Sequence, residues 1–263
     1  MKYVVVTGSN GGMGKAVVEK LSSLGYFVFA LDLHAGEPQQ NVVSIAVDVT
    51  DANSIQSAVE VVKQHTDKLD ALVHFAGIYK MESLVEMTEK DFAHIIDVNL
   101  FGCYRVNKAF LPLLHKGSKV VITSSELAPL DPLPFTGIYG ITKSALEKYA
   151  FSLRMELQLL GINVVVLRPG AVKTDMLGVS TSQLDKFVSN TQLYKCNATR
   201  FKGIVDKVEA RNVAPQKVAK KTAKILSKRR PRYVYKLNRN PLLLMLNALP
   251  DRWQTGIIKG ILK

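Results

Sequence analysis

The stretch Thr7-Gly8-Ser9-Asn10-Gly11-Gly12-Met13-Gly14 decides the fold of this chain. It follows the apolar, β-branched run Tyr3–Val6, which is typical of a buried strand. It precedes residues 15–24, whose apolar positions recur at helical spacing, and Gly25 ends that predicted helix. A glycine-rich turn that opens a helix presents unpaired backbone N–H groups and the positive end of the helix dipole. The stretch therefore predicts a phosphate-binding site.

Glycine has two uses in such a turn. A Cβ atom would hold a pyrophosphate away from the backbone, and it would oppose the dihedral angles that the turn needs. A tight turn without any ligand is the alternative interpretation. The residues predicted to hold the phosphates are Gly8, Asn10, Gly11, Gly12, Met13 and Gly14.

Composition limits the class of protein. A chain of 263 residues with 47% hydrophobic residues suits one globular α/β domain with a sizeable core. Cys103 and Cys196 form no disulfide or metal-binding pattern, so we expect no metal site. No basic leader with an apolar h-region begins the chain, and no run reaches the ~20 apolar residues of a membrane span. We therefore expect a cytoplasmic protein.

The chain carries a net charge of +13, most of it late in the sequence. Such a charge suits nucleic acid, an anionic membrane or an acidic partner, or simply a soluble surface. We expect no nucleic-acid binding, because basic and aromatic residues are not interleaved and no known binding module appears.

Strands alternate with helices along the chain, which predicts a doubly wound parallel sheet with helices on both faces. The ligand site is then expected at the carboxyl ends of the strands. The predicted strands are residues 3–6, 27–31, 42–47, 69–74, 119–123, 162–167 and 233–235.

Asp32 ends the second predicted strand, within the ~20-residue spacing expected of a carboxylate that binds the ribose of a dinucleotide. It would accept hydrogen bonds from both ribose hydroxyls and repel a 2′-phosphate. Leu33 and His34 follow, with no arginine to hold that phosphate. NAD is therefore favoured over NADP, which stays an alternative. Asp32 could also simply cap a loop.

The pattern Thr-Gly-x-x-x-Gly-x-Gly, the pair Tyr139-x-x-x-Lys143 and the turn Pro169-Gly170 occur in this order. Together they resemble the short-chain dehydrogenase/reductase family. The apolar and basic C-terminal stretch resembles the tails of its hydroxysteroid and retinol dehydrogenase branch. The resemblance implies a single-domain Rossmann fold and an oxidoreductase. Its members are usually dimers or tetramers built on two long helices, so a homodimer or homotetramer is expected.

Spacing i,i+4 places Tyr139 and Lys143 on one helix face. The cationic lysine and the positive nicotinamide of the oxidised cofactor are together expected to lower the pKa of the phenol. Tyr139 would then exchange a proton near neutral pH, and Ser125 would hold the substrate oxygen. Ser124 is a second candidate for that serine, because Ser125 lies one residue farther from Tyr139 than the family usually has. The resemblance adds Asn99 as a kinked-helix residue that links Lys143 to solvent through water.

The resemblance also implies further contacts with the dinucleotide. Asp48 and Val49 would contact the adenine, and Ala76 and Gly77 would let the backbone approach the adenosine ribose. Lys143 would also hold the nicotinamide ribose. The turn after the sixth strand would hold the nicotinamide through Pro169, Gly170, Val172 and Thr174. His74 replaces an amide of the family pattern and is interpreted as structural.

We expect residues 1–240 to form the catalytic domain, with a lid at about 175–211, and residues 241–263 to form an apolar and basic tail. The tail fits an amphipathic helix with a basic rim. It could lie at a membrane surface, making the protein peripheral there, or pack on its own domain or on a partner subunit.

The predicted reaction is hydride transfer between NAD(H) and an apolar alcohol or ketone such as a steroid, retinoid or lipid alcohol. One alternative is a 3-oxoacyl-carrier-protein reductase, whose acidic partner would suit the basic surface. The other is a non-catalytic dinucleotide-binding sensor or scaffold.

Overall fold

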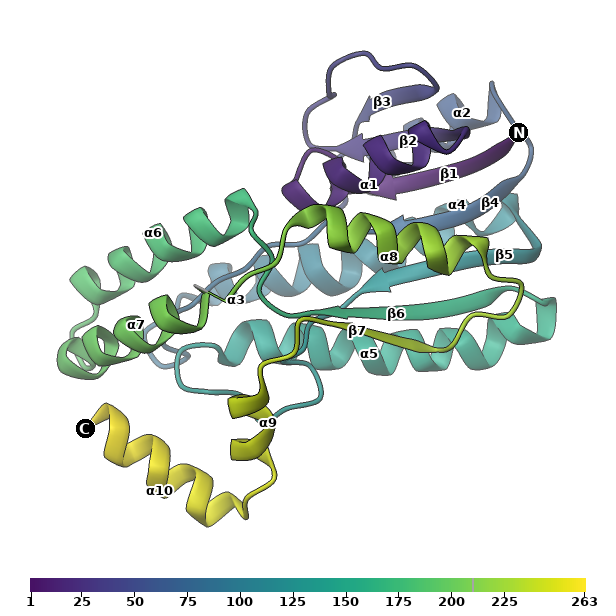
Figure 1. Ribbon diagram of the computed structural model, residues 1–263. Helices are drawn as coiled ribbons and strands as arrows, with labels where there is room; N and C mark the ends of the chain where they lie inside the picture. Colours follow the sequence, from purple (N-terminus) through teal and green to yellow (C-terminus); the bar gives the residue numbers. More distant parts are fainter. Residues whose placement is uncertain (210) are drawn as a thin grey trace.

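The computed structural model describes residues 1–209 and 211–263, without the side chains of residues 175–181, 208 and 209. Its centre is a parallel sheet in the order β3-β2-β1-β4-β5-β6-β7 (Figure 1). The order runs outward in both directions from β1, so the predicted doubly wound fold is confirmed. The strands are β1 Lys2–Thr7, β2 Tyr26–Asp32, β3 Val42–Ala46, β4 Leu69–His74, β5 Leu114–Thr123, β6 Asn163–Pro169 and β7 Val234–Leu237.

Helices connect the strands and cover the sheet. They are α1 Gly12–Ser23, α2 Ala52–Lys63, α3 Glu89–Ile96, α4 Gly102–Phe110, α5 Gly137–Leu157, α6 Asp175–Asn190, α7 Lys195–Glu209, α8 Pro215–Ser227, α9 Pro241–Asn247 and α10 Asp251–Leu262. Shorter segments are the π-helix Asp97–Phe101 between α3 and α4, and the 3₁₀ turns Leu111–Leu113 and Gln158–Leu160.

Each face of the sheet has its own apolar core, because side chains along a strand point alternately to opposite faces. Val5 of β1 belongs to the cluster under α2, α4 and α5. Its neighbours Val4 and Val6 belong to the cluster under α1 and α8. The helices therefore bury both faces and leave the carboxyl ends of the strands for a ligand.

A third apolar cluster lies beyond the sheet, where Phe135 contacts Leu184 of α6 and Phe201 of α7. The segment predicted as a lid thus consists largely of two helices, which extend away from the sheet (Figure 1). Three parts of this segment lie outside the described residues: Ala210 and the side chains of Met176 and Leu177.

The C-terminal tail packs on its own domain. The backbone N–H of Asp131 donates to Asn247 Oδ1 at 2.6 Å, and Asn197 Nδ2 donates to the carbonyl of Leu262 at 2.7 Å. The tail is two helices because Pro250 separates α9 from α10. In the part of the chain that the structure describes, no helix is long and apolar enough to cross a bilayer.

Candidate active site

A cavity of about 220 Å³ opens at the carboxyl ends of the strands. It is lined from both ends of the chain, since Met13 of α1 and Leu243 of α9 both reach it. Its other lining residues include Gly77, Ser124, Ser125, Tyr139, Lys143, Pro169, Gly170, Val172 and Thr174. The structure therefore brings Ser125, Tyr139, Lys143 and the predicted nicotinamide turn together around one cavity, whereas Asn99 is not among its lining residues.

The glycines of the first turn are required by close approach of the chain to itself. A Cβ on Gly8, whose φ is +67°, would lie 2.5 Å from the backbone of Phe75 and Ala76. A Cβ on Gly14 would lie 2.0 Å from the carbonyl oxygen of Gly8, and one on Gly12 would lie 2.7 Å from Thr174 Cγ2. Substitution would thus displace the turn itself, whether or not a phosphate is bound.

The start of α1 suits an anion. Gly11 is the N-cap of α1 and no side chain caps the helix, so its first backbone N–H groups have no capping acceptor. These N–H groups, together with the helix dipole, fit the pyrophosphate of a dinucleotide.

Asp32 is oriented by the glycine turn. Its Oδ2 accepts a hydrogen bond from the backbone N–H of Asn10 and its Oδ1 one from that of Leu33, each at 2.8 Å. The Asn10 side chain donates to the carbonyl of His34 at 2.6 Å. Each carboxylate oxygen has a second lone pair, so the fixed carboxylate can still accept from ribose hydroxyls.

Asp48 and Val49 follow β3. Asp48 Oδ1 accepts hydrogen bonds from the backbone N–H and the hydroxyl of Thr50, and these bonds lower the pKa of Asp48. Val49 lies against the start of α4, where a Cβ on Gly102 would come within 2.8 Å of its side chain. Asp48 thus stays charged and in a fixed orientation at the end of its strand.

Asn99 lies in the π-helix Asp97–Phe101, so the helix is distorted at this residue as expected. Its side chain accepts from Ile78 N at 2.8 Å and donates to Ile78 O at 2.9 Å and to Thr142 Oγ1 at 3.1 Å. A Cβ on Gly77 would lie 3.1 Å from Asn99 Oδ1 and 3.6 Å from Lys143 Nζ. Asn99 therefore ties the turn after β4 to α5. The water link to solvent stays a prediction.

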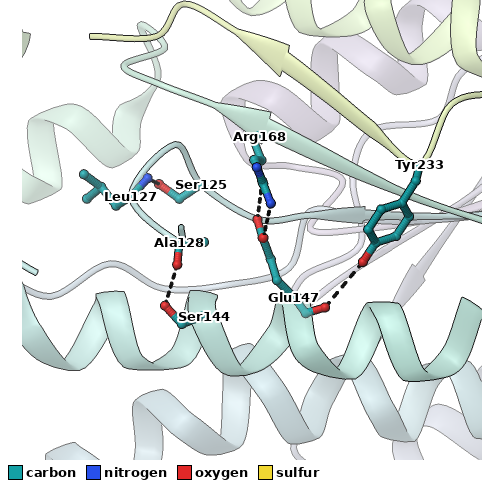
Figure 2. A network of polar contacts seen from close by, with 7 residues as sticks. All are labelled: Ser125, Leu127, Ala128, Ser144, Glu147, Arg168 and Tyr233. Carbon is teal, nitrogen blue, oxygen red and sulfur yellow. Dashed lines mark hydrogen bonds and ion pairs between the residues drawn. The ribbon is translucent and has the colours of Figure 1, made fainter. Parts of the chain in front are cut away.

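Ser125 and Tyr139 line the same cavity, and the Ser125 hydroxyl acts to lower the pKa of the Tyr139 phenol. Ser125 Oγ accepts a hydrogen bond from the backbone N–H of Leu127 at 3.2 Å (Figure 2). The Ser124 hydroxyl lines the same cavity, is 2% exposed and has no hydrogen-bond partner among the described residues. The effect of Ser125 on Tyr139 favours Ser125 over Ser124 as the serine that would hold the substrate oxygen.

Lys143 lies behind Tyr139, with its Nζ 5.5 Å from the centre of the Tyr139 ring and donating to Thr123 O at 3.2 Å. Burial lowers the pKa of Lys143 to about 8. Burial also raises the pKa of Tyr139 to about 12, against the lowering effect of Ser125. In the protein alone, desolvation is the largest effect on the pKa of Tyr139, and it opposes the lowering expected from Lys143 and the nicotinamide together. The lowering by the bound cofactor stays a prediction.

A second polar network fixes α5, which carries Tyr139 and Lys143. The guanidinium of Arg168 on β6 pairs with the Glu147 carboxylate, with Nε 2.7 Å from Oε1 (Figure 2). Ser144 Oγ donates to the carbonyl of Ala128 at 2.7 Å. The helix is therefore held both to the strand beside it and to the loop that follows Ser125.

The turn after β6 is held by the segment before α8. The backbone N–H of Lys173 donates to Val213 O at 2.9 Å, and Val213 N donates to Ala171 O at 3.1 Å. Val172 is buried beneath this bridge, and Thr174 lies against Gly12. The predicted nicotinamide turn thus contacts the predicted phosphate turn directly.

His74 does not line the cavity. It is buried, its Nε2 lies 2.9 Å from Asn107 Oδ1, and burial lowers its pKa to about 4. A histidine that stays neutral and hydrogen-bonded in the core agrees with its interpretation as a structural residue.

Sequence reasoning missed Tyr79 and Glu126. The Tyr79 ring meets that of Tyr139 edge to face, with centroids 4.5 Å apart. Glu126 lines the cavity directly after Ser125. Glu126 could have been predicted, because an acidic residue directly follows Ser124 and Ser125 at the end of a strand. No pattern in the sequence predicts that Tyr79 contacts Tyr139.

Comparison with known proteins agrees with this arrangement. A family model described as short chain dehydrogenase matches residues 2–185. A 3-ketodihydrosphingosine reductase of Bacteroides thetaiotaomicron is 26% identical over 253 residues, covering 96% of this chain and 93% of the relative. Retinol dehydrogenase 16 of Mus musculus is 36% identical over 202 residues, covering 73% of this chain and 62% of the relative. The chain thus spans less than two thirds of that second relative.

A short-chain dehydrogenase/reductase of Burkholderia phymatum, solved in complex with NAD, has the same fold. It superposes with a TM-score of 0.77 at 22% identity, covering 94% of this chain and 92% of the other.

Proposed function

The chain belongs to the short-chain dehydrogenase family, and we propose that it interconverts a long-chain lipid ketone and its alcohol with NAD(H). As a member of this family it is an oxidoreductase that acts on CH–OH or keto groups. The observation that carries the proposal is that Ser125 and Tyr139, with Lys143 behind Tyr139, lie together at the wall of a largely apolar cavity.

The residues around the first turn fit a dinucleotide. The start of α1 would hold its pyrophosphate, Asp32 the adenosine ribose and the 169–174 turn its nicotinamide. When bound, such a cofactor donates or accepts the hydride. Asp32 supports NAD(H) over NADP(H), because its carboxylate would repel a 2′-phosphate.

The chain's own residues would handle the proton. Ser125 donates a hydrogen bond to the carbonyl oxygen, and Tyr139 delivers its hydroxyl proton to that oxygen as the carbonyl carbon is reduced. Oxidation of the alcohol runs the same transfer backward. The buried phenol must lose a proton in this direction, and the nearby ammonium of Lys143 stabilises the phenolate that forms.

A lipid substrate is supported by the rest of the cavity wall. Its apolar members include Leu127 and Leu133 from the loop after β5, Phe201 and Ile204 from α7, and Leu243 from α9. One relative matched over nearly its whole length is named for a 3-ketodihydrosphingosine. A carrier-protein reductase would use NADPH in the usual case, and Asp32 argues against that cofactor.

The tail supplies a second surface next to this cavity. Met245 of α9 and Trp253 of α10 are 68% and 65% exposed, while Leu243 of α9 lines the cavity. Arg252, Lys259 and Lys263 are exposed along the same helix as Trp253. We propose that this face rests on an anionic membrane, from which an apolar substrate would reach the cavity.

The test of the reaction is Tyr139→Phe, assayed with NADH and a long-chain ketone. We expect the variant to lose at least 1,000-fold in kcat while calorimetry shows NADH binding unchanged within about twofold. Unchanged turnover would refute the assignment. If the native chain binds NADH but reduces no ketone, the sensor or scaffold alternative is favoured.

A further inference from the structure

Glu126 is an acid in a cavity made for an apolar molecule. Among the described lining residues it is the only acidic one, and Lys143 is the only basic one. Lys143 lies behind Tyr139 and donates to Thr123. Glu126 is partly buried in this wall. Partial burial of a carboxylate costs free energy unless a partner compensates for it.

The backbone fixes Glu126 at the edge of the reaction centre. Its N–H donates to the carbonyl of Pro169 at 2.9 Å, which places it between the ends of β5 and β6. It directly follows Ser125, and consecutive Cα atoms lie about 3.8 Å apart. A substrate oxygen held by Ser125 would therefore place the neighbouring carbon atoms close to the Glu126 side chain.

Only part of the carboxylate is used by the protein. Oε2 accepts from the backbone N–H of Asn240 at 2.6 Å. Oε1 lies beside Gly170, where a Cβ would come within 2.6 Å of it. Oε1 accepts no hydrogen bond, and Glu126 forms no ion pair, among the residues that the structure describes. Burial raises the pKa of Glu126, while Asn240 N–H and the charge of Arg239 lower it.

Ser124 gives an independent sign of a polar ligand at the same place. Its hydroxyl is buried, lines the cavity and lacks a partner among the described residues. The Glu126 carboxylate oxygen and the Ser124 hydroxyl oxygen, two residues apart in the chain, are acceptors for a group with several N–H donors. A primary ammonium has three such donors and also supplies a positive charge to pair with the carboxylate.

We propose that Glu126 binds a protonated amine carried close to the reacting carbon, so that the substrate is a long-chain amino ketone or the matching amino alcohol. This inference rests on the proposed function. The ammonium lies against Glu126 Oε1, the keto oxygen lies between Ser125 and Tyr139, and the alkyl chain follows the apolar wall toward Leu243. Specificity arises because a ketone without the amine covers Glu126 Oε1 without giving it a hydrogen-bond donor.

The decisive comparison uses two substrates and two glutamate variants. The substrates are a long-chain 2-amino-3-ketone and the same ketone without the amine. In Glu126→Gln the amide oxygen can still accept from Asn240 N–H, so the contact with α9 is kept while the charge is removed. The matched control is Glu86→Gln, since Glu86 also accepts backbone hydrogen bonds, from Gln192 and Leu193, but does not line this cavity.

In the native enzyme we expect kcat/KM to be at least tenfold higher for the amino ketone. Glu126→Gln should lose at least tenfold for the amino ketone and change less than twofold for the plain ketone. Glu86→Gln should change neither value more than twofold. Equal losses for both ketones in Glu126→Gln would show that Glu126 only supports the fold, and no change for either would also overturn the proposal.

A binding measurement separates this inference from the proposed reaction. Calorimetry measures the affinity for the long-chain amino alcohol and for the plain alcohol. Glu126→Gln should weaken binding of the amino alcohol at least tenfold and change binding of the plain alcohol less than twofold. If the native protein reduces neither ketone but binds the amino alcohol through Glu126, the reaction is wrong and the amine site stands. If it reduces both ketones equally well, the reaction stands and the amine site is wrong.

Discussion

The Asn99 side chain holds both backbone polar groups of Ile78, accepting from its N–H at 2.8 Å and donating to its carbonyl at 2.9 Å. The same amide donates to Thr142 Oγ1 on α5. One polar side chain in a π-helix therefore sets the distance between the turn at Gly77 and the helix that carries Lys143. Because Asn99 lies in a π-helix, the regular helical period does not predict that its side chain bonds to Ile78 and Thr142.

Asn99→Ala would leave the N–H and the carbonyl of Ile78 without their partner. We expect the free energy of unfolding to fall by on the order of 3 kcal/mol and kcat to fall at least tenfold. Chemical denaturation and steady-state kinetics check the two effects. Asn53→Ala, on the exposed side of α2, is the control and should change neither quantity appreciably. If the free energy of unfolding of Asn99→Ala falls while its kcat is unchanged, Asn99 has no role in positioning the site.

Asp32→Asn tests the cofactor preference. The substitution keeps the shape at the end of β2 but removes the charge that would repel a 2′-phosphate. We expect the ratio of kcat/KM with NADH to kcat/KM with NADPH to fall at least tenfold. Glu37→Gln, an exposed carboxylate on the following loop, should leave the ratio unchanged. A native enzyme that already prefers NADPH would contradict this interpretation of Asp32.

His74 predicts a dependence of stability on pH. Its pKa in the folded protein is about 4, below the usual 6.5, so the unfolded chain binds the proton more readily between these values. Stability is therefore lost as the pH falls from about 6.5 to about 4. With about 1.4 kcal/mol for each pKa unit, the loss from this group is about 3 kcal/mol.

His74→Asn should remove this part of the pH dependence, whatever it does to stability at neutral pH. Urea denaturation at several pH values between 4 and 7 measures the slope. His34→Asn, at an exposed position, should keep the native slope. A slope that is identical in the native protein and in His74→Asn would show that another group is responsible.

The outer faces of α4 and α5 predict an oligomer. Tyr104 is 43% exposed, while Phe151 and Met155 are 51% and 50% exposed. The family resemblance implies assembly through two such helices. We expect Met155→Glu to shift the protein toward monomers in sedimentation analysis. Leu193→Glu changes a more exposed residue, 64% exposed, between α6 and α7 and should leave the assembly intact. A native protein that is monomeric at micromolar concentration would refute the expectation.

The tail predicts binding to anionic vesicles. Trp253→Glu removes apolar area and adds a negative charge on α10, so we expect binding to vesicles with 30% phosphatidylserine to fall at least tenfold. Leu24→Glu, at the end of α1, is the control. Binding should weaken with salt, since part of it is electrostatic. Equal binding to neutral vesicles, or none to either kind, would contradict the proposal.

The structure also divides the basic residues of the chain into two regions. Those of residues 217–232 lie on α8 and the loop after it, away from α10, so they do not extend the rim of the tail (Figure 1). The sequence places the two groups close together in the chain, but β7 runs between them and separates them in space. The two groups of basic residues therefore belong to different parts of the surface.

The sequence by itself determined the strands, the doubly wound parallel sheet and the helix that pairs Tyr139 with Lys143. These features depend on local periods: two residues in strands, 3.6 in helices, and four residues between side chains on one helix face. The glycine turn and Asp32 were readable for the same reason, since each adjoins a strand end whose position the local pattern reveals.

Only the tertiary structure decided how the site is tuned. The pKa of Tyr139 depends on burial by segments such as the one that carries Tyr79, 60 residues away, and no local pattern reports it. The same holds for the free oxygen of Glu126, which depends on Gly170 and Asn240 meeting beside it. Burial and electrostatic balance arise from distant segments packed together, so they exist only once the chain has folded.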